Sequence, residues 1–177
     1  MDSADCFHLI EATMSPEVIL LLEDSDERIA TFQATVSEME PGADLHHWSD
    51  AQAFIAESGR FHGRVILISL DHDLVRMAGA ARDPGDGLEV AAWLAQQRPV
   101  CPVIVHSTNH ERVESMLNEL RFGGWTHERI APHGDTWIEQ RWRRAAEALI
   151  QEHRRRPGLS PIGATVELPS DHTERME

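Results

Sequence analysis

Ionisable side chains gather directly after two apolar segments of this sequence. One segment is followed by Asp71, His72 and Asp73, and the other is followed by His106. Imidazoles transfer protons near neutral pH, and carboxylates are hard oxygen ligands for a divalent cation. Because both apolar segments are expected to be buried strands, we predict that the residues at their ends share one pocket with acid–base or metal-assisted chemistry.

Strand-like and helix-like segments alternate along the chain and would position these residues. Short apolar runs predict strands, and apolar residues at three- and four-residue spacing predict helices. The predicted strands are Val18–Leu22, Ala43–His47, Val65–Leu70, Val103–Val105 and Arg129–Ala131. Each is followed by a predicted helix, and capping boxes at the second and the last of these helices are predicted from the pairs Ser49/Gln52 and Thr136/Glu139.

This alternation predicts an α/β fold with a single doubly wound, five-stranded parallel sheet in the order 2-1-3-4-5. The domain is expected to span residues 17–150, after an N-terminal extension at 1–16 and before a flexible, disordered tail at 151–177. In this strand order the carboxyl ends of the central strands meet at the switch point. The residues expected to converge there are Glu23, Asp24, Asp71, Asp73, His106 and Ser107.

Composition limits the function classes. The formal net charge of −14 over 177 residues opposes general binding of DNA through a broad basic surface. The two cysteines, Cys6 and Cys101, do not suggest a disulfide framework, which fits a reducing cytoplasm. No apolar run approaches the roughly 18 residues of a membrane span, so we expect a cytoplasmic protein with no membrane partner.

Three positions resemble the receiver domains of bacterial response regulators. Asp24 follows the first strand, Asp71 the third and Ser107 the fourth, where receivers carry an acidic pair, a phosphoacceptor aspartate and a hydroxyl. The resemblance covers Glu17–Ile150 and implies a receiver/flavodoxin-like fold. Receivers carry a lysine within a Lys-Pro pair after the fifth strand. Ala131 stands at that position here, which argues against ordinary phosphorelay signalling.

The segments Leu70–Leu74 and Val105–Asn109, together with Met116, are similar to the cyclic-phosphate-processing receiver-like family. The resemblance implies hydrolysis or recognition of cyclic phosphate ends or cyclic nucleotides, in RNA repair or in nucleotide-based conflict systems. Its implied partners are a cyclic-phosphate nucleotide or an RNA end. A homodimer through the face of the fourth and fifth strands is also expected, because receivers commonly pair there.

Opening a 2′,3′-cyclic phosphate requires an activated water, a proton donor for the leaving oxygen and stabilisation of transition-state charge. His106 is the first choice for the acid or base, and His72 or His133 is the second. Asp71 would orient an imidazole or hold a cation. The remaining predicted site residues are Asp24, Asp71 and Asp73 as ligands of Mg²⁺ or another divalent cation, and Ser107 and Asn109 as substrate-binding residues.

Each of these residues also has a structural interpretation. His106 at a buried strand end can be a hydrogen-bonded core histidine, and His72 points away from its neighbours if the strand continues. Asp24 and Asn109 can cap helices, and His133 lies in a Pro-His-Gly turn. Two functions therefore remain: a cyclic phosphodiesterase-like phosphoesterase, and a degenerate receiver that acts as a protein-interaction or ligand-sensing module.

Overall fold

The computed structural model describes residues 15–75 and 82–155, in which strands and helices alternate. The strands are β1 (Glu17–Leu22), β2 (Ala43–Trp48), β3 (Val65–Asp71), β4 (Val103–His106) and β5 (His127–Arg129). The helices are α1 (Asp26–Met39), α2 (Ala51–Glu57), α3 (Gly87–Leu94), α4 (His110–Phe122) and α5 (Arg143–Arg155). Two further helical turns are the 3-10 helix η1 (Ser58–Phe61) and the π-helix η2 (Ile138–Trp142).

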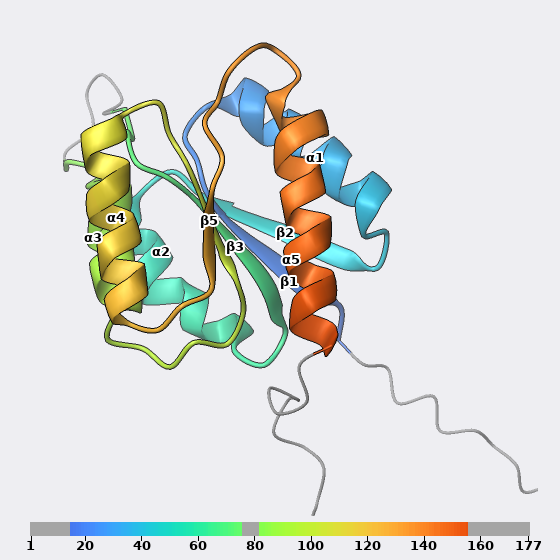
Figure 1. Cartoon of the computed structure of the whole chain (residues 1–177), viewed down its shortest axis with the longest axis horizontal. Helices are drawn as coiled ribbons and strands as arrows, with labels where there is room; N and C mark the ends of the chain where they lie inside the picture. The colour runs from blue at the N-terminus through green and yellow to red at the C-terminus, as the bar shows by residue number, and fades with distance from the viewer. Residues whose placement is uncertain (1–14, 76–81, 156–177) are drawn as a thin grey trace, which may run out of the picture.

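The strands of this part of the chain form one five-stranded parallel sheet in the order β2-β1-β3-β4-β5, which confirms the predicted fold class (Figure 1). The switch point lies between β1 and β3, where the direction of winding reverses. Asp71 is the register partner of His106, and Leu22 is the partner of Leu70. The carboxyl ends of β1, β3 and β4 therefore lie at one edge of the sheet.

Helices cover both faces of the sheet: α1 and α5 lie on one face, and α2, α3 and α4 lie on the other (Figure 1). The side chains of β1 divide between the two cores. Leu20 and Leu22 pack toward α2–α4, whereas Ile19 and Leu21 pack toward α1 and α5. Because both faces are buried, the strand is a continuous apolar run without polar alternation.

Both predicted capping boxes are wrong. Asp50 caps α2, since its carboxylate accepts a hydrogen bond from Ala53 N at 2.8 Å, and Ser49 lies one position too early. An acidic residue directly before the helix supplies the acceptor that the pattern assigned to the serine. At the last helix the chain enters η2 through Trp137 with no side-chain cap, so Thr136 does not have that role either.

The fifth strand lies earlier than predicted. β5 is a partly exposed edge strand of polar residues, His127–Arg129, and such a segment has no apolar signal in the sequence. Ile130, which follows it, is buried and donates its N–H to Val105 O at 3.0 Å. The apolar signal that predicted a strand at 129–131 therefore belongs to a core residue after the strand.

The last helix, α5, continues to Arg155, past the expected domain boundary at residue 150. The rest of the predicted tail at 151–177, and the predicted extension at 1–16 apart from its last two residues, lie outside the described residues. Within residues 15–75 and 82–155, no helix combines the length and the apolar character needed to cross a membrane.

Gly87 begins α3 against the end of β3, and its N–H donates to His72 O at 3.0 Å. A Cβ atom there would lie 2.1 Å from the carbonyl oxygen of Asp71 and 2.9 Å from His72 Cα. We expect Gly87→Ala to lower the free energy of unfolding by about 2–3 kcal/mol, because backbone atoms cannot yield as a flexible side chain would. Urea denaturation measures the loss. Gly59→Ala is the matched control, since no atom lies within 4 Å of its Cβ, and an equal loss in both variants would contradict the prediction.

Candidate active site

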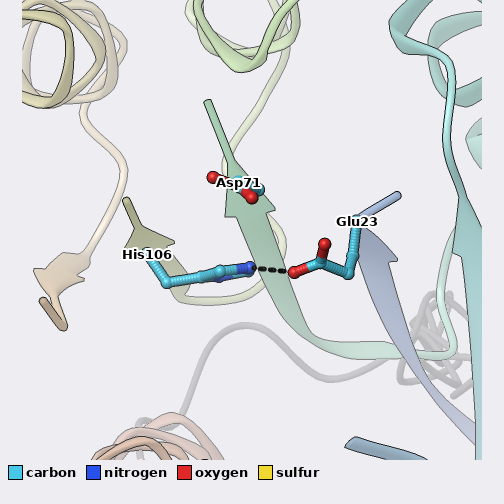
Figure 2. Close-up of side chains that lie close together, drawn as sticks. All are labelled: Glu23, Asp71 and His106. Carbon is cyan, nitrogen blue, oxygen red and sulfur yellow. Dashed lines mark ion pairs between the residues drawn. The ribbon is translucent and has the colours of Figure 1, made fainter. Parts of the chain in front are cut away.

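Three buried ionisable side chains meet at the carboxyl edge of the sheet (Figure 2). Glu23 follows β1, Asp71 ends β3 and His106 ends β4. One ligand atom from each residue lies within 4.8 Å of the other two. Their relative exposures are 0% for Glu23, 4% for Asp71 and 0% for His106. This group, the buried cluster, lies at the switch point where the sequence predicted the site.

Backbone amides hold the Glu23 carboxylate in the turn between β1 and α1. Its Oε1 accepts hydrogen bonds from the N–H groups of Asp24 and Ser25, both at 2.9 Å. Ser25 then caps α1 by accepting a bond from Arg28 N at 3.4 Å. The first turn of α1 thereby returns the Arg28 side chain to the carboxylate that precedes the helix.

Arg28 supplies the positive charge at the buried cluster. Its Nη2 donates to Glu23 Oε1 at 2.7 Å and to Asp71 Oδ2 at 2.9 Å, and it lies 3.6 Å from Asp24 Oδ1. The Arg28 side chain is 34% exposed, whereas those of Glu23 and Asp71 are 0% and 5% exposed. The guanidinium offsets the repulsion between the two buried carboxylates. Of Arg28, Glu23 and Asp71, Arg28 is the residue whose side chain a ligand can reach.

His106 is the member of the buried cluster that is enclosed by the core. Its side chain is 0% exposed, and its ring centroid lies 5.3 Å from that of Phe32 and 5.6 Å from that of Trp137. The ring Nδ1 is 2.9 Å from Ser69 Oγ, which also accepts a hydrogen bond from Trp142 Nε1 at 2.9 Å. Packed aromatic rings and a buried hydrogen-bond chain therefore fix the orientation of this imidazole.

The two His106 ring nitrogens face different polar groups. The Trp142 indole can only donate, but a hydroxyl can both donate and accept, so Ser69 Oγ can pair with His106 Nδ1 in either tautomer of the ring. The other ring nitrogen, Nε2, faces Glu23 Oε2 at 3.4 Å. Neither of these two atoms has a well-formed hydrogen bond within the described residues. The contact is long for a hydrogen bond, yet it lowers the pKa of Glu23 through hydrogen bonding as well as through charge.

The two buried carboxylates have pKa values shifted in opposite directions. Burial by itself raises the pKa of Glu23, but the hydrogen bond and charge of His106, the N–H of Ser25 and the Arg28 guanidinium outweigh it and lower the pKa to about 2. Burial raises the pKa of Asp71, and the charge of Glu23 raises it further, while His106 and Arg28 oppose the increase only in part. Glu23 thus stays ionised, and Asp71 is the carboxylate that exchanges a proton more readily.

A second polar group surrounds Asp73, whose side chain is 57% exposed, whereas its neighbours His72 and Ser107 are buried. Ser107 Oγ donates to Asp73 Oδ2 at 3.4 Å, and Asn109 Nδ2 donates to Oδ1 at 3.5 Å. His72 Nε2 lies 3.6 Å from Asp73 Oδ1, and the Nδ1 of this ring is buried without a hydrogen-bond partner among the described residues. The predicted substrate-binding pair, Ser107 and Asn109, is therefore brought together, although Asn109 also caps α4.

A cavity of about 730 Å³ opens beside the exposed part of Arg28, between the start of α1, the segment after β2 and the segment before α3. A cavity of this size falls in the range of small-molecule sites. Its wall combines acidic, basic and hydroxyl groups, among them Asp24, Arg28, Ser49, Asp50 and Arg82. The cavity gives a ligand access to the guanidinium of Arg28 from solvent.

The three predicted metal ligands do not form a single group. Asp71 belongs to the buried cluster, but the other members of that cluster are Glu23 and His106. Asp24 lies on the cavity wall, where its carboxylate accepts a hydrogen bond from the N–H of Val75. Asp73 is the exposed member of the second polar group. Asp24 is also not the cap of α1, since the residue after it has that role.

His133 is placed apart from the other predicted catalytic residues. It lies on the exposed loop before η2, where its backbone carbonyl accepts a hydrogen bond from Arg141 at 2.6 Å. Conversely, the sequence reasoning did not single out Arg28, Ser69 or Trp142. A signal existed for Arg28, which lies four residues after Asp24, and for Ser69, a lone hydroxyl inside an apolar strand.

A family model described as the cyclic-phosphate processing receiver domain matches residues 18–122. The match extends from β1 through α4 and includes every residue of the buried cluster. No curated protein matches the chain significantly.

Similar solved structures are receiver domains. One is the receiver domain of a sensor histidine kinase from Pseudomonas aeruginosa, which has a magnesium ion in its active-site cleft. It matches with a TM-score of 0.56 and 17% sequence identity, and the match covers 77% of this chain and 98% of that chain. A response regulator in its Mn²⁺-bound form has a TM-score of 0.54 and 24% identity, over 75% of this chain and 93% of that one. A phosphorylated cyanobacterial phytochrome response regulator has a TM-score of 0.55 and 19% identity, and the match covers 79% of this chain and 95% of that chain. These similarities show the receiver fold.

Proposed function

Because this chain belongs to the cyclic-phosphate processing receiver domain family, we propose that it binds and opens a cyclic phosphate at the carboxyl edge of its sheet. The proposed substrate is a nucleoside or RNA end that carries a 2′,3′-cyclic phosphate, in RNA repair or nucleotide-based conflict. Water attacks phosphorus, the bond from phosphorus to one ribose oxygen breaks, and a phosphomonoester forms.

The observation that carries this proposal is that Glu23 and Asp71 share one guanidinium while their pKa values are shifted apart. Two carboxylates in different environments can divide the work between charge and proton transfer. Glu23 remains an anion and holds Arg28 in place. Asp71 accepts the proton of the attacking water, a task suited to a carboxylate whose pKa is raised toward the working pH.

The leaving ribose oxygen needs a proton, and His72 is the proposed donor. Its imidazole lies against Asp73, beside the hydroxyl and amide of Ser107 and Asn109. These two polar groups are proposed to bind phosphate oxygens or a base edge once they exchange Asp73 for the substrate. His133 is the alternative donor, and it would have to reach the phosphate from the exposed loop before η2.

His106 is proposed to act through Glu23, without contact to the substrate. Its nitrogens face Ser69 and Glu23, and its ring is enclosed by aromatic side chains. An imidazole in this place could reach a phosphate at the mouth only by leaving its packing. Its role is therefore that of a positioning residue, which favours the ionised form of Glu23 and so the anchoring of Arg28.

The residues as placed do not fit the expected Mg²⁺ site. Mg²⁺ demands octahedral oxygen ligands, whereas the third member of the buried cluster offers an imidazole nitrogen, that of His106. In addition, Arg28 already donates to the oxygens of Glu23 and Asp71 that face it. The proposed reaction therefore uses only the chain's own groups.

Phosphorus NMR tests the proposal directly. Purified protein is mixed with a panel of 2′,3′-cyclic nucleotides and with RNA that ends in a cyclic phosphate. We expect the cyclic-phosphate signal to be replaced by that of a phosphomonoester. If no substrate is turned over or bound, the alternative is favoured: a degenerate receiver that acts as an interaction module, for which Phe122, 89% exposed at the end of α4, offers a contact.

A further inference from the structure

We infer that Arg28 takes the place of the divalent cation in this receiver-like site, so that its guanidinium binds the phosphate of the ligand and no metal ion is required. The part of this inference that concerns a cyclic phosphate rests on the proposed function. The part that concerns the metal does not, because it follows from the contacts of Arg28 with the acidic residues.

The first step is the position of the positive charge. Arg28 Nη2 lies 2.7 Å from Glu23 Oε1, 2.9 Å from Asp71 Oδ2 and 3.6 Å from Asp24 Oδ1. It therefore touches acidic side chains that follow β1 and end β3, at the switch point of the sheet. A divalent cation that binds the same oxygens would have to displace the guanidinium, because two like charges within a few ångströms repel strongly in a partly buried site.

The second step is that this guanidinium is anchored. The carboxylate of Glu23 is fully buried, accepts hydrogen bonds from two backbone N–H groups and faces His106. These contacts hold it in this position. The helix turn that carries Arg28 is itself capped by Ser25. An anchored arginine loses little conformational freedom when it binds a ligand, and its planar fork matches phosphate oxygens.

The third step is access. Both short contacts to carboxylates use Nη2, and the Arg28 side chain is 34% exposed. It lines the cavity of about 730 Å³ together with Ser49 and Arg82, and four carboxylates lie on the same wall, those of Asp24, Asp26, Glu27 and Asp50. A nucleotide could therefore occupy this cavity with its phosphate on Nη1, because Nη2 contacts the carboxylates and Nε is buried. The ligand class that follows is a phosphate monoanion such as a nucleoside cyclic phosphate, bound without a bridging metal.

A rival metal position lies deeper in the same cluster. Glu23 Oε2 and His106 Nε2 face each other at 3.4 Å and have no other partner within the described residues, and Asp71 is close to both. A nitrogen-tolerant cation such as Mn²⁺ could use these three groups. Mn²⁺ is therefore the appropriate probe, since it reports binding at either position.

The first experiment titrates Mn²⁺ into the full chain by isothermal calorimetry. We expect Arg28→Ala to bind Mn²⁺ at least about tenfold more tightly than the wild type, because the variant exposes the acidic oxygens. Arg60→Ala removes an exposed arginine that pairs with Glu57 outside the site, and it should match the wild type. Wild-type binding as tight as that of Arg28→Ala would overturn the inference and favour the deeper position.

Loss of Arg28 leaves buried carboxylates unpaired, which destabilises the metal-free Arg28→Ala variant. Arg28→Lys then decides the question, because its ammonium keeps a charge but has one nitrogen, so it cannot contact the carboxylates and also offer a second nitrogen to phosphate as a fork does. We expect it to stay folded by circular dichroism and to bind Mn²⁺ more tightly than the wild type. If it is folded and binds Mn²⁺ no more tightly, the inference is wrong.

The second experiment measures binding of adenosine 2′,3′-cyclic phosphate with and without EDTA. We expect the wild-type dissociation constant to be unchanged by EDTA and that of Arg28→Lys to rise at least about tenfold. Loss of wild-type binding in EDTA would overturn the inference. If the wild type binds no cyclic nucleotide under any condition, the proposed function fails, while the Mn²⁺ titration still decides whether Arg28 replaces the metal.

Discussion

Replacement of Asp71 by asparagine is expected to lower the rate of cyclic-phosphate opening by about 10²–10⁴ while leaving the fold intact. Asp71 accepts hydrogen bonds from His72 N at 2.7 Å and from Arg28 Nη2 at 2.9 Å. Asparagine has the same size, but it cannot take a proton from water, and its amide can accept from only one of these two donors. Phosphorus NMR under single-turnover conditions measures the loss.

The pH dependence provides a second readout of the same role. A general base must be ionised, so the rate should fall as the pH drops through the pKa of Asp71, which burial holds above the ordinary 3.8. The charge of Glu23 contributes to this increase. In Glu23→Gln the acid limb of the rate profile should therefore move to lower pH, although the total rate also falls because Arg28 loses an anchor.

The matched control is Asp44→Asn, which removes an exposed carboxylate from β2 on the far side of β1. This variant should keep the wild-type rate and the wild-type profile. An Asp71→Asn protein that turns over within about threefold of the wild type would show that Asp71 is not the base. In that case His72 would be the next residue to test.

The sheet could be predicted from the sequence because its strands are buried on both faces. A run such as Val65–Leu70 has no amphipathic alternation, and this is typical of a parallel strand covered by helices. The strand order then follows from the alternation of elements and the switch-point rule. The fifth strand was predicted two residues too late, because an edge strand of polar residues has no apolar signal and the buried Ile130 after it has one.

The candidate site was predictable in position and less so in its contacts. Strand ends determine where Asp71 and His106 lie, but the pleat determines which way a side chain points, and His106 points into the core between Phe32 and Trp137. Arg28 was missed because its role depends on the first turn of a helix that folds back over Glu23, a contact between two elements. Single-sequence patterns report periodicity within an element and do not report such contacts.

His106→Ala is expected to lower the free energy of unfolding at pH 7 by about 3 kcal/mol. The variant leaves the fully buried carboxylate of Glu23 without the imidazole that faces it at 3.4 Å. His106 is a leading cause of the decrease in the Glu23 pKa to about 2, so part of that decrease is lost with the imidazole, while the N–H of Ser25 and the Arg28 guanidinium remain. The lost ring also leaves space between Phe32 and Trp137, which adds to the cost.

Urea denaturation across acid pH separates the charge effect from the packing effect. A carboxylate with a depressed native pKa contributes stability above its unfolded pKa, and this contribution is lost as the pH falls from about 4.5 to about 2. The wild type should lose stability over that range more steeply than His106→Ala, in which the Glu23 pKa is closer to its unfolded value. His62→Ala, at an exposed position, should retain the wild-type stability and slope. If His106→Ala did the same, the amides of the turn and Arg28 would suffice to keep Glu23 ionised. A direct acid–base role for His106 would then regain support over the positioning role proposed here.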